Sequence, residues 1–188
     1  MGIDLGWNEA VKKFVTNVGL ITTNGPWGHN IMAAEWTRQI SYEPPLLSVH
    51  VSKRHATYDN IMKSREFGAS ITASDQDFVS SVAGNYKGKI TDKIAMLKDL
   101  GVKLYRAKRI DVLMVRRAAA NMECKVVRIL DMGDHAMFVG RIVKVGWSKK
   151  EPILYHQGKY WKLGKRIEKP TQKFRDRVAT LAEKHRRK

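Results

Sequence analysis

The sequence has little cysteine and no long apolar segment. Cys124 is its one cysteine among 188 residues, which excludes an intrachain disulfide and any cysteine-rich zinc or iron–sulfur site. No uninterrupted apolar run approaches the roughly 20 residues that cross a bilayer. Residues 1–10 contain two acids and no basic residue, unlike a secretory signal. We therefore expect a cytoplasmic protein without a membrane partner, in which Cys124 is a buried apolar side chain.

Common catalytic and cofactor motifs are also missing. There is no glycine-rich phosphate loop of either common type, no nucleophile elbow and no His-Glu-x-x-His helix. The six histidines show no metal-ligand spacing on a single element. These absences disfavour a hydrolase or a metalloenzyme, and we expect no metal site.

Acidic residues are scarce relative to basic ones. The chain has 35 Lys and Arg against 18 Asp and Glu, a net charge of +17. Residues 162–188 hold 11 of the basic residues and 3 of the acids, so about half of the excess lies in the tail. Because no aromatic residue except Phe174 alternates with these charges, a solvated basic helix is favoured over a weak anion binder or an RNA contact. Nucleic acid is not expected as a partner.

Short strand-like runs separated by turn signals dominate the first two-thirds of the chain. Three of them cover residues 18–23, 30–36 and 46–52. In the third run, apolar Leu47, Val49 and Val51 alternate with polar residues, as in a half-buried strand. A further strand is predicted over residues 67–72.

The remaining segments predict short helices and two hairpins. We expect helices over residues 57–65, which begins with the hydroxyl of Thr57, over 75–82, with Asp75 as N-cap, and over 91–100 and 171–187. We expect hairpins with arms at residues 122–130 and 136–145, joined by a turn at 131–134, and at 153–155 and 160–163. No βαβ rhythm is visible. The pattern favours a mainly β protein, an antiparallel closed barrel, over a Rossmann or flavodoxin architecture.

The loop after the third strand is the strongest local chemical signal. Ser52, Lys53, Arg54, His55 and Thr57 place two hydroxyls, an ammonium, a guanidinium and an imidazole between a strand end and a helix start. Such donors can surround a phosphate. A solvated basic turn is an equally good interpretation from composition alone.

Two further elements are weaker signals. Ala33 and Ala34 would let a flat ligand approach the backbone of the strand over residues 30–36, although most such pairs only pack. His135 follows Gly133-Asp134 at a tight turn, where a lone histidine is more often structural than catalytic.

Taken in order, these segments resemble the flavin reductase-like domain, the FMN-binding split barrel of flavin reductases, flavoredoxins and archaeal ferric reductases. The resemblance covers residues 18–163. Each motif is weak singly, but the ordered series is specific. Its carriers are residues 21–23, 30–36, 40–46, 55–61, 67–68, 123–124, 133–140 and 152–156.

The resemblance implies a fold and an activity. It implies a split-barrel domain over residues 1–165, with Greek-key antiparallel strands, followed by a basic helical extension over residues 166–188. It also implies an NAD(P)H-dependent flavin reductase that binds FMN, or FAD, as a homodimer. Hydride would pass from NADH or NADPH to flavin N5, and electrons would then reach free flavin, ferric complexes or a partner protein. A flavoredoxin-like electron carrier, reduced by a partner protein without direct NAD(P)H oxidation, is the alternative.

The same resemblance implies the cofactor-binding residues and no catalytic side chain, because the flavin carries the chemistry. His135 would lie near the flavin or the nicotinamide. Glu35 stands where many relatives have a small polar residue, and would either lower the flavin potential or pair with an arginine. The segment bordering the flavin ring would contribute Asn30, Met32, Ala33, Ala34, Glu35 and Trp36. The segment at the ribityl chain and phosphate would contribute Val51, Ser52, Lys53, Arg54, His55 and Thr57. The helix facing the cofactor cleft would contribute Ser80, Ser81 and Asn85.

Overall fold

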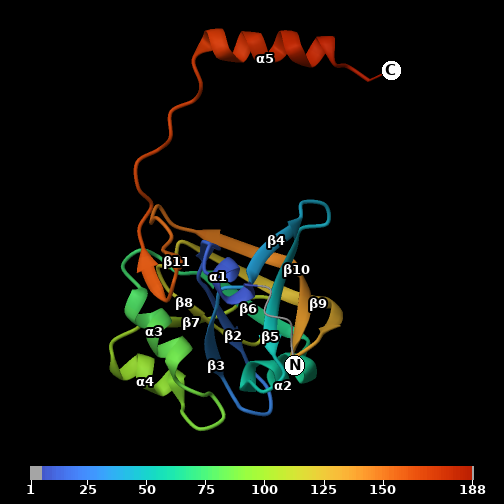
Figure 1. Ribbon diagram of the computed structural model, residues 1–188. Coiled ribbons are helices and arrows are strands. Elements are labelled where there is room, and N and C mark those ends of the chain that lie inside the picture. The colour runs from blue at the N-terminus through green and yellow to red at the C-terminus, as the bar shows by residue number, and fades with distance from the viewer. Residues whose placement is uncertain (1–5, 188) are drawn as a thin grey trace.

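Seven strands form one antiparallel sheet in the computed structural model, which describes residues 6–187 (Figure 1). Its two edge strands are consecutive in the chain and are joined only by Glu35 and Trp36. The sheet must therefore curl until its edges meet, which confirms the predicted antiparallel barrel. The strand order is β3 (Asn30–Ala34), β2 (Gly19–Thr23), β6 (Glu66–Ile71), β9 (Ala120–Met132), β10 (His135–Trp147), β5 (Leu46–Ser52) and β4 (Thr37–Ser41).

Smaller elements surround the barrel. A three-stranded sheet has the order β1 (Thr16–Asn17), β11 (Leu154–His156) and β12 (Lys159–Trp161), and β7 (Leu104–Arg106) pairs with β8 (Leu113–Val115). The helices are α1 (Trp7–Val11), α2 (Ala56–Ser64), α3 (Asp77–Asn85), α4 (Lys93–Asp99) and α5 (Gln172–Lys184). Within residues 6–187, no helix has both the length and the apolar character needed to span a membrane.

The long predicted hairpin is confirmed and extends further than expected. Strands β9 and β10 each contain 13 residues, and the turn between them narrows to Gly133 and Asp134. Gly133 has φ +73°, which favours glycine. The strand expected over residues 30–36 ends at Ala34, because the chain turns there into β4.

Helix α4 begins at Lys93 rather than at residue 91, and two further predicted helix starts are wrong. Helix α3 begins at Asp77 rather than Asp75, whose carboxylate is held by the ammonium of Lys150. Helix α2 begins at Ala56, and the hydroxyl of Thr57 does not cap it but accepts a hydrogen bond from Asn30 Nδ2 at 2.9 Å. In both cases a partner distant in sequence takes the side chain that local reasoning assigned to the cap.

Where helices α3 and α4 cover the outside of the barrel, its wall is buried on both its inner and its outer face. All five residues of β2 are buried. Ile21 points into the barrel interior, where it joins a cluster that includes Val49, Phe67 and Phe138. Leu20 points outward into a second cluster, formed with side chains of α3 and α4 such as Val79, Val82, Ile94 and Leu97. The outer cluster fixes both helices beside β3.

Cys124 lies fully buried in the barrel interior, as predicted. Burial raises the pKa of its thiol to about 12, so the thiolate is disfavoured. Gly140 on β10 lies beside it. A Cβ at Gly140 would lie 2.7 Å from the Phe67 ring and 2.8 Å from Cys124 Cβ, so glycine is needed for this packing.

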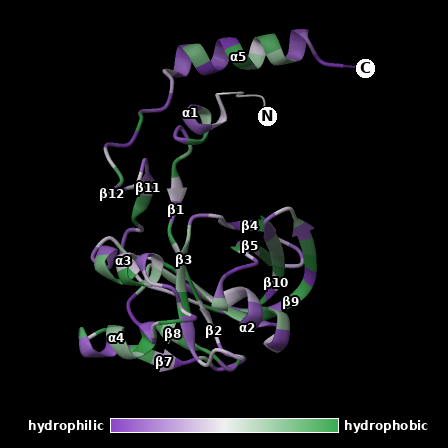
Figure 2. Cartoon of the chain, turned by 60° about the horizontal axis from the view of Figure 1, so that its bottom comes forward, coloured by the Kyte–Doolittle hydropathy of each residue, from purple (hydrophilic) through white to green (hydrophobic). Residues whose placement is uncertain are grey.

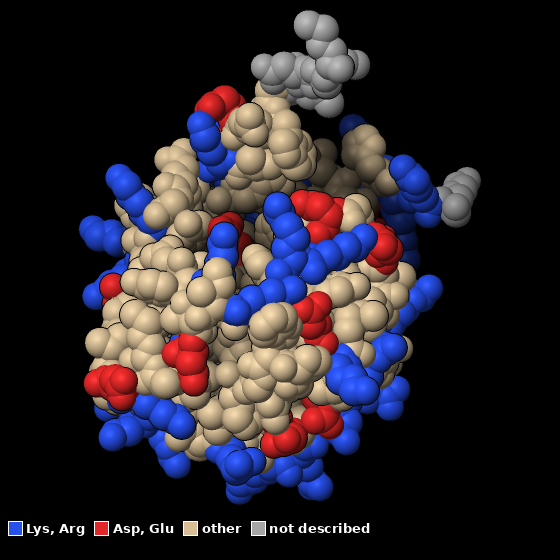
Figure 3. Space-filling view, turned by 90° about the horizontal axis from the view of Figure 1, so that it is seen from below, with Lys and Arg blue, Asp and Glu red and all other residues tan. Residues whose placement is uncertain are grey.

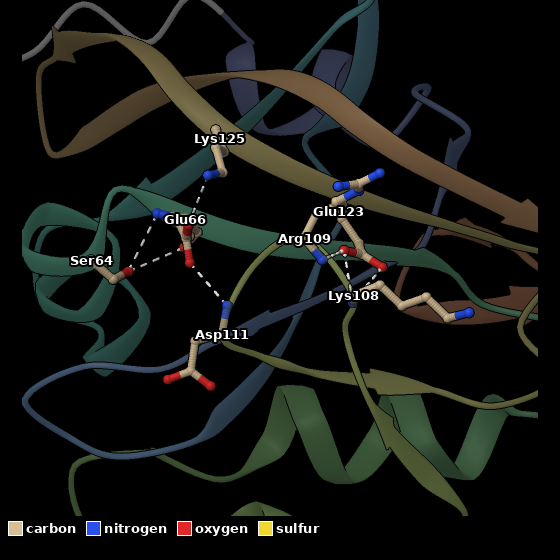
Figure 4. A network of polar contacts seen from close by, with 7 residues as sticks. All are labelled: Ser64, Glu66, Lys108, Arg109, Asp111, Glu123 and Lys125. Carbon is tan, nitrogen blue, oxygen red and sulfur yellow. Dashed lines mark hydrogen bonds and ion pairs between the residues drawn. The ribbon is translucent and has the colours of Figure 1, made fainter.

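A buried carboxylate attaches the β7–β8 loop to the barrel (Figure 4). Glu123 on β9 is 3% exposed and accepts hydrogen bonds from the backbone N–H groups of Lys108 and Arg109, the latter at 2.6 Å. Glu66 on β6 accepts the backbone N–H of Asp111 at 2.9 Å. Two carboxylates from neighbouring strands thus accept the backbone hydrogen bonds that would otherwise go to a paired strand.

Replacing Glu123 should destabilise the fold. Glu123→Ala leaves two backbone donors without their acceptor, and we expect the free energy of unfolding to fall by about 2–3 kcal/mol. Urea denaturation monitored by tryptophan fluorescence measures it. Glu168→Ala, at an exposed position beyond the barrel, is the control and should leave the urea midpoint unchanged. Equal midpoints for the two variants would contradict this account of Glu123.

The barrel carries both positive and negative side chains, whereas the C-terminal tail, residues 162–188, is mainly basic. On the face in Figure 3, Lys and Arg are spread around the surface with Asp and Glu between them. Helix α5 stands away from the barrel at the end of an extended linker, and all of its residues are exposed (Figure 1).

Candidate functional site

A cavity of about 590 Å³ lies between β3, the start of α2 and the segment joining α3 to α4. Its volume is within the usual range for small-molecule and cofactor sites. Its floor is the β3 strand and its rim is largely basic. The lining residues are Asn30, Met32, Ala33, Arg54, His55, Ala56, Thr57, Ala83, Gly84, Asn85, Tyr86, Lys87, Gly88, Lys89, Ile90 and Lys93.

Side-chain hydrogen bonds fix the walls of the cavity. Asn30, 4% exposed, joins β3 to α2 through its bond to Thr57. The loop before α2 is held by backbone bonds, from Lys53 N–H to Asp134 O at 3.2 Å and from His55 N–H to Ser52 O at 3.0 Å. The positions of Arg54 and His55 therefore depend on the ends of β5 and β10.

Glycines allow the α3–α4 segment to close over β3. A Cβ at Gly88 would lie 2.3 Å from Asn30 Oδ1 and 3.2 Å from Ala56 Cβ. At Gly84 a Cβ would lie 3.5 Å from Ala33 Cβ, an ordinary contact. Gly88 is thus the position at which the segment needs glycine to approach both β3 and α2.

Four cationic side chains line the cavity. Lys89 pairs with Asp59, with an Nζ to Oδ2 distance of 2.7 Å. Lys93 is 3% exposed and its Nζ donates to the backbone carbonyl of Ala83 at 2.9 Å. Arg54 and Lys87 form no ion pair with any residue between 6 and 187. Positive charge therefore exceeds negative charge at this rim.

The ionisation of two residues reflects this excess. Burial lowers the pKa of Lys93 to about 8, since the ammonium has only one carbonyl to replace water. The pKa of His55 is also lowered, first by burial and then by the positive charges of Lys93, His135, Arg54 and Lys89. An anion in the cavity would offset these charges and favour protonation of both residues.

The hydroxyl of Ser52 lies near the cavity but does not line it. The residue is 5% exposed at the end of β5, and its Oγ has no hydrogen-bond partner among the described residues. A buried hydroxyl without a partner is unfavourable. The nearby start of α2 has no side-chain cap, so its first N–H groups also favour a negative ligand. These N–H groups, together with Arg54 and Lys93 of the cavity lining, fit a phosphate-bearing cofactor.

Many of the residues expected at the cofactor line this cavity. They come from β3, from the loop before α2, from the start of α2 and from the end of α3. They are Asn30, Met32, Ala33, Arg54, His55, Thr57 and Asn85.

The other expected residues do not line it. Ala34 and Val51 belong to the barrel interior. Ser52 is buried behind the loop, and Lys53 is held by Asp131 at 2.8 Å. Ser80 accepts a hydrogen bond from Tyr160 Oη, Ser81 accepts one from Asn85 Nδ2, and His135 Nδ1 lies 2.7 Å from Asp134 Oδ1.

Glu35 and Trp36 line a second cavity of about 930 Å³, together with residues of α1, β5 and β11. Burial raises the pKa of Glu35, and no arginine pairs with it among residues 6–187, so the arginine pair, one of the two alternatives for Glu35, is absent there. The Trp36 ring lies 4.9 Å from that of His135 and 6.0 Å from that of His50. His135 is therefore connected to the second cavity through Trp36.

Sequence reasoning missed the basic segment over residues 86–93. Its signal was the run Gly84-Asn85-Tyr86-Lys87-Gly88-Lys89, which has two glycines and two lysines beside an expected site residue. Lys93 gave no signal, because a single lysine in a short helix normally faces solvent. Within residues 6–187, no group of three or more His, Cys, Asp or Glu side chains is arranged to hold a metal ion.

Comparison with known proteins gives a consistent family. The profile described as Flavin reductase like domain matches residues 11–164. An uncharacterised protein of Pyrococcus abyssi is 32% identical over 121 residues, 64% of this chain and 67% of that protein. The NADH-dependent flavin reductase of a Rhodococcus species is 26% identical over 158 residues, 81% and 82% of the two chains. The structure of the NADH:FAD oxidoreductase SgcE6 of Streptomyces globisporus superposes with a TM-score of 0.78 at 18% identity, covering 88% and 97%.

The electrostatic description of the cavity can be tested without any ligand. Replacing Lys93 with methionine removes a positive charge that lowers the pKa of His55, so this pKa should rise. An NMR titration of the imidazole C–H signals measures it. Lys98→Met, on the exposed side of the same helix, is the control and should leave the pKa of His55 unchanged. No rise in Lys93→Met would contradict the assignment of this charge to the cavity.

Proposed function

The chain belongs to the flavin reductase like domain family, and we propose that it is an NAD(P)H-dependent flavin reductase that binds FMN. The observation that supports the proposal is that one cavity has an apolar strand on one side and, on the other, a cluster of cations that outnumber the nearby acids. Met32 and Ala33 form the apolar side, whereas Arg54, Lys87 and Lys93 form the cationic side. A ligand with a flat ring and a phosphate matches both sides, because the ring can lie on the apolar side and the phosphate can bind the cations.

Arg54, Lys93 and the start of α2 would hold the phosphate. Arg54 contributes a guanidinium without an ion pair among the described residues, which suits bidentate binding of phosphate oxygens. Lys93 contributes a buried charge and is shielded from competing ions. Lys53 contributes less than its neighbour, because Asp131 holds its ammonium.

The strand β3 and the α3–α4 segment would hold the ring between them. Ala33 and Gly84 lie close together, since a Cβ on Gly84 would be 3.5 Å from Ala33 Cβ, so a flat group would lie beside this pair and against the β3 side of the cavity. Asn30 and Gly88 close the far side and exclude water. When bound, the flavin supplies the redox chemistry, since its N5 accepts hydride from C4 of a nicotinamide. The protein's part is to orient the two rings and to shield them.

The nicotinamide would approach the flavin ring from the side of the second cavity, because hydride transfer needs the two rings in contact and the two cavities share no lining residue. The second cavity begins at Glu35, two residues beyond Ala33 on the same segment, and contains the exposed aromatic ring of Trp36. His135 would then act through Trp36 rather than by direct contact with the first cavity. The Rhodococcus relative and SgcE6 are both named as NADH-dependent, which supports NADH as the donor.

The proposal includes a homodimer. Several large apolar side chains on the hairpin of β9 and β10 are exposed, among them Val127, Val143, Val145 and Trp147, the last at 81%. A group of exposed apolar side chains on one element favours a protein contact. Pairing of two barrels through this hairpin would bury them.

The direct test is the flavin itself. Purified protein should release FMN on denaturation, at about one per chain, or should bind added FMN with a change in its visible spectrum. Anaerobic addition of NADH should then bleach the flavin absorbance. A protein that binds no flavin would refute the proposal. One that binds FMN but is bleached by neither NADH nor NADPH would instead be an electron carrier.

The phosphate assignment predicts a difference between two neighbouring cations. Arg54→Gln should weaken FMN binding about tenfold while changing riboflavin binding by less than about twofold, because riboflavin has no phosphate. Lys53→Gln is the matched control and should leave both affinities nearly unchanged, since Asp131 already holds this ammonium. Fluorescence titration of the unchanged protein and of both variants measures all six affinities. Equal losses for FMN and riboflavin in Arg54→Gln would contradict a phosphate contact.

A further inference from the structure

Helix α5 lies outside the region that matches the family profile, residues 11–164, and outside the barrel. Thr171 caps its start by accepting the N–H of Phe174 at 3.4 Å, and no residue of the helix is buried. An isolated helix of 13 residues is marginal in water, so a surface that covers one side of α5 would stabilise it.

One side of α5 is apolar. Phe174, Val178 and Leu181 are spaced by four and three residues, which places them on one face of a helix. They are 55%, 49% and 43% exposed, so nothing covers this face. Figure 2 shows the resulting mixture of hydrophobic and hydrophilic residues around the helix.

The charges of α5 are sorted around this apolar stripe. At about 100° per residue, Arg175 lies beside the stripe on one side and Arg177 on the other. The helix's two acids, Asp176 and Glu183, lie on the opposite face. A solvated helix needs no such order. Cations at the borders of an apolar stripe and acids opposite it match an interfacial helix on an anionic lipid surface.

The linker continues the same charge. Between β12 and α5 it contains Lys162, Lys165, Arg166 and Lys169 against a single acid, Glu168. An extended basic segment and a basic helix can lie on one anionic plane together, whereas a groove on a protein would accept only the helix. The positive charge of residues 1–161, 24 basic against 15 acidic, disfavours a second copy of this chain as the occupant.

We propose that residues 162–187 bind an anionic phospholipid surface, with Phe174, Val178 and Leu181 inserted between headgroups and the flanking arginines on lipid phosphates. The expectation of no membrane partner rested on the lack of a spanning segment, which an interfacial helix does not need. An RNA partner is disfavoured because it would use the charges of the tail but not its aliphatic stripe.

The test is sedimentation of the full-length protein with two kinds of vesicle, pure phosphatidylcholine and phosphatidylcholine with about 30% phosphatidylglycerol. The protein should bind only the second kind, and high salt should weaken binding. Val178→Ser with Leu181→Ser, and separately Arg175→Gln with Arg177→Gln, should each lower the partition coefficient about tenfold.

Two matched control variants test whether the loss of binding is specific to the apolar stripe and to the arginines beside it. Ala179→Ser with Thr180→Ser places serines off the stripe, and Lys63→Gln with Lys149→Gln removes the same charge from the barrel. Both should bind within about twofold of the unchanged protein. The proposal is overturned if anionic vesicles are not bound at low salt, or if either control loses as much binding as its partner. It is also overturned if single-stranded poly(U) is bound more tightly than vesicles and the stripe variant binds it equally well.

Discussion

The structure depends on the two-residue corner between β3 and β4. Because Glu35 and Trp36 alone join the two edge strands of the sheet, the sheet has to close, and closure brings the edge of β3 toward the end of β5. The bond between Asn30 and Thr57 then links β3 to α2, and Gly88 lets the α3–α4 segment approach both. The first cavity is the space left between these elements, and the second begins on the other side of the corner.

The sequence predicted the barrel well where alternation was clear. The run Leu47, Val49 and Val51 lies in β5, all three are buried, and the hairpin of β9 and β10 has its turn at Gly133-Asp134. Short elements such as β1, β7 and β8 were not predicted, because two or three residues carry no periodicity. The helix starts were wrong where Asp75 and Thr57 found distant partners, which local propensity does not reveal.

The candidate site was only partly predictable for the same reason. Residues in the loop before α2 and at its start were named from their chemistry, and Arg54, His55 and Thr57 line the first cavity. Lys53 is in the same loop but turns to Asp131. Lys93 became visible only in three dimensions, because its burial against Ala83 depends on how α3 and α4 pack on the outer side of β2 and β3. The sequence resemblance supplied the flavin, and the geometry distinguishes the cations that can meet its phosphate from those that cannot.

The central claim is that the first cavity holds FMN with its phosphate at Arg54 and Lys93. A crystal structure of the protein with FMN tests it most directly. The account predicts the flavin ring against Met32 and Ala33 of β3, and phosphate oxygens within hydrogen-bonding distance of both cations. A flavin bound in the second cavity, or a phosphate that contacts Lys53 and Asp131 instead, would contradict it.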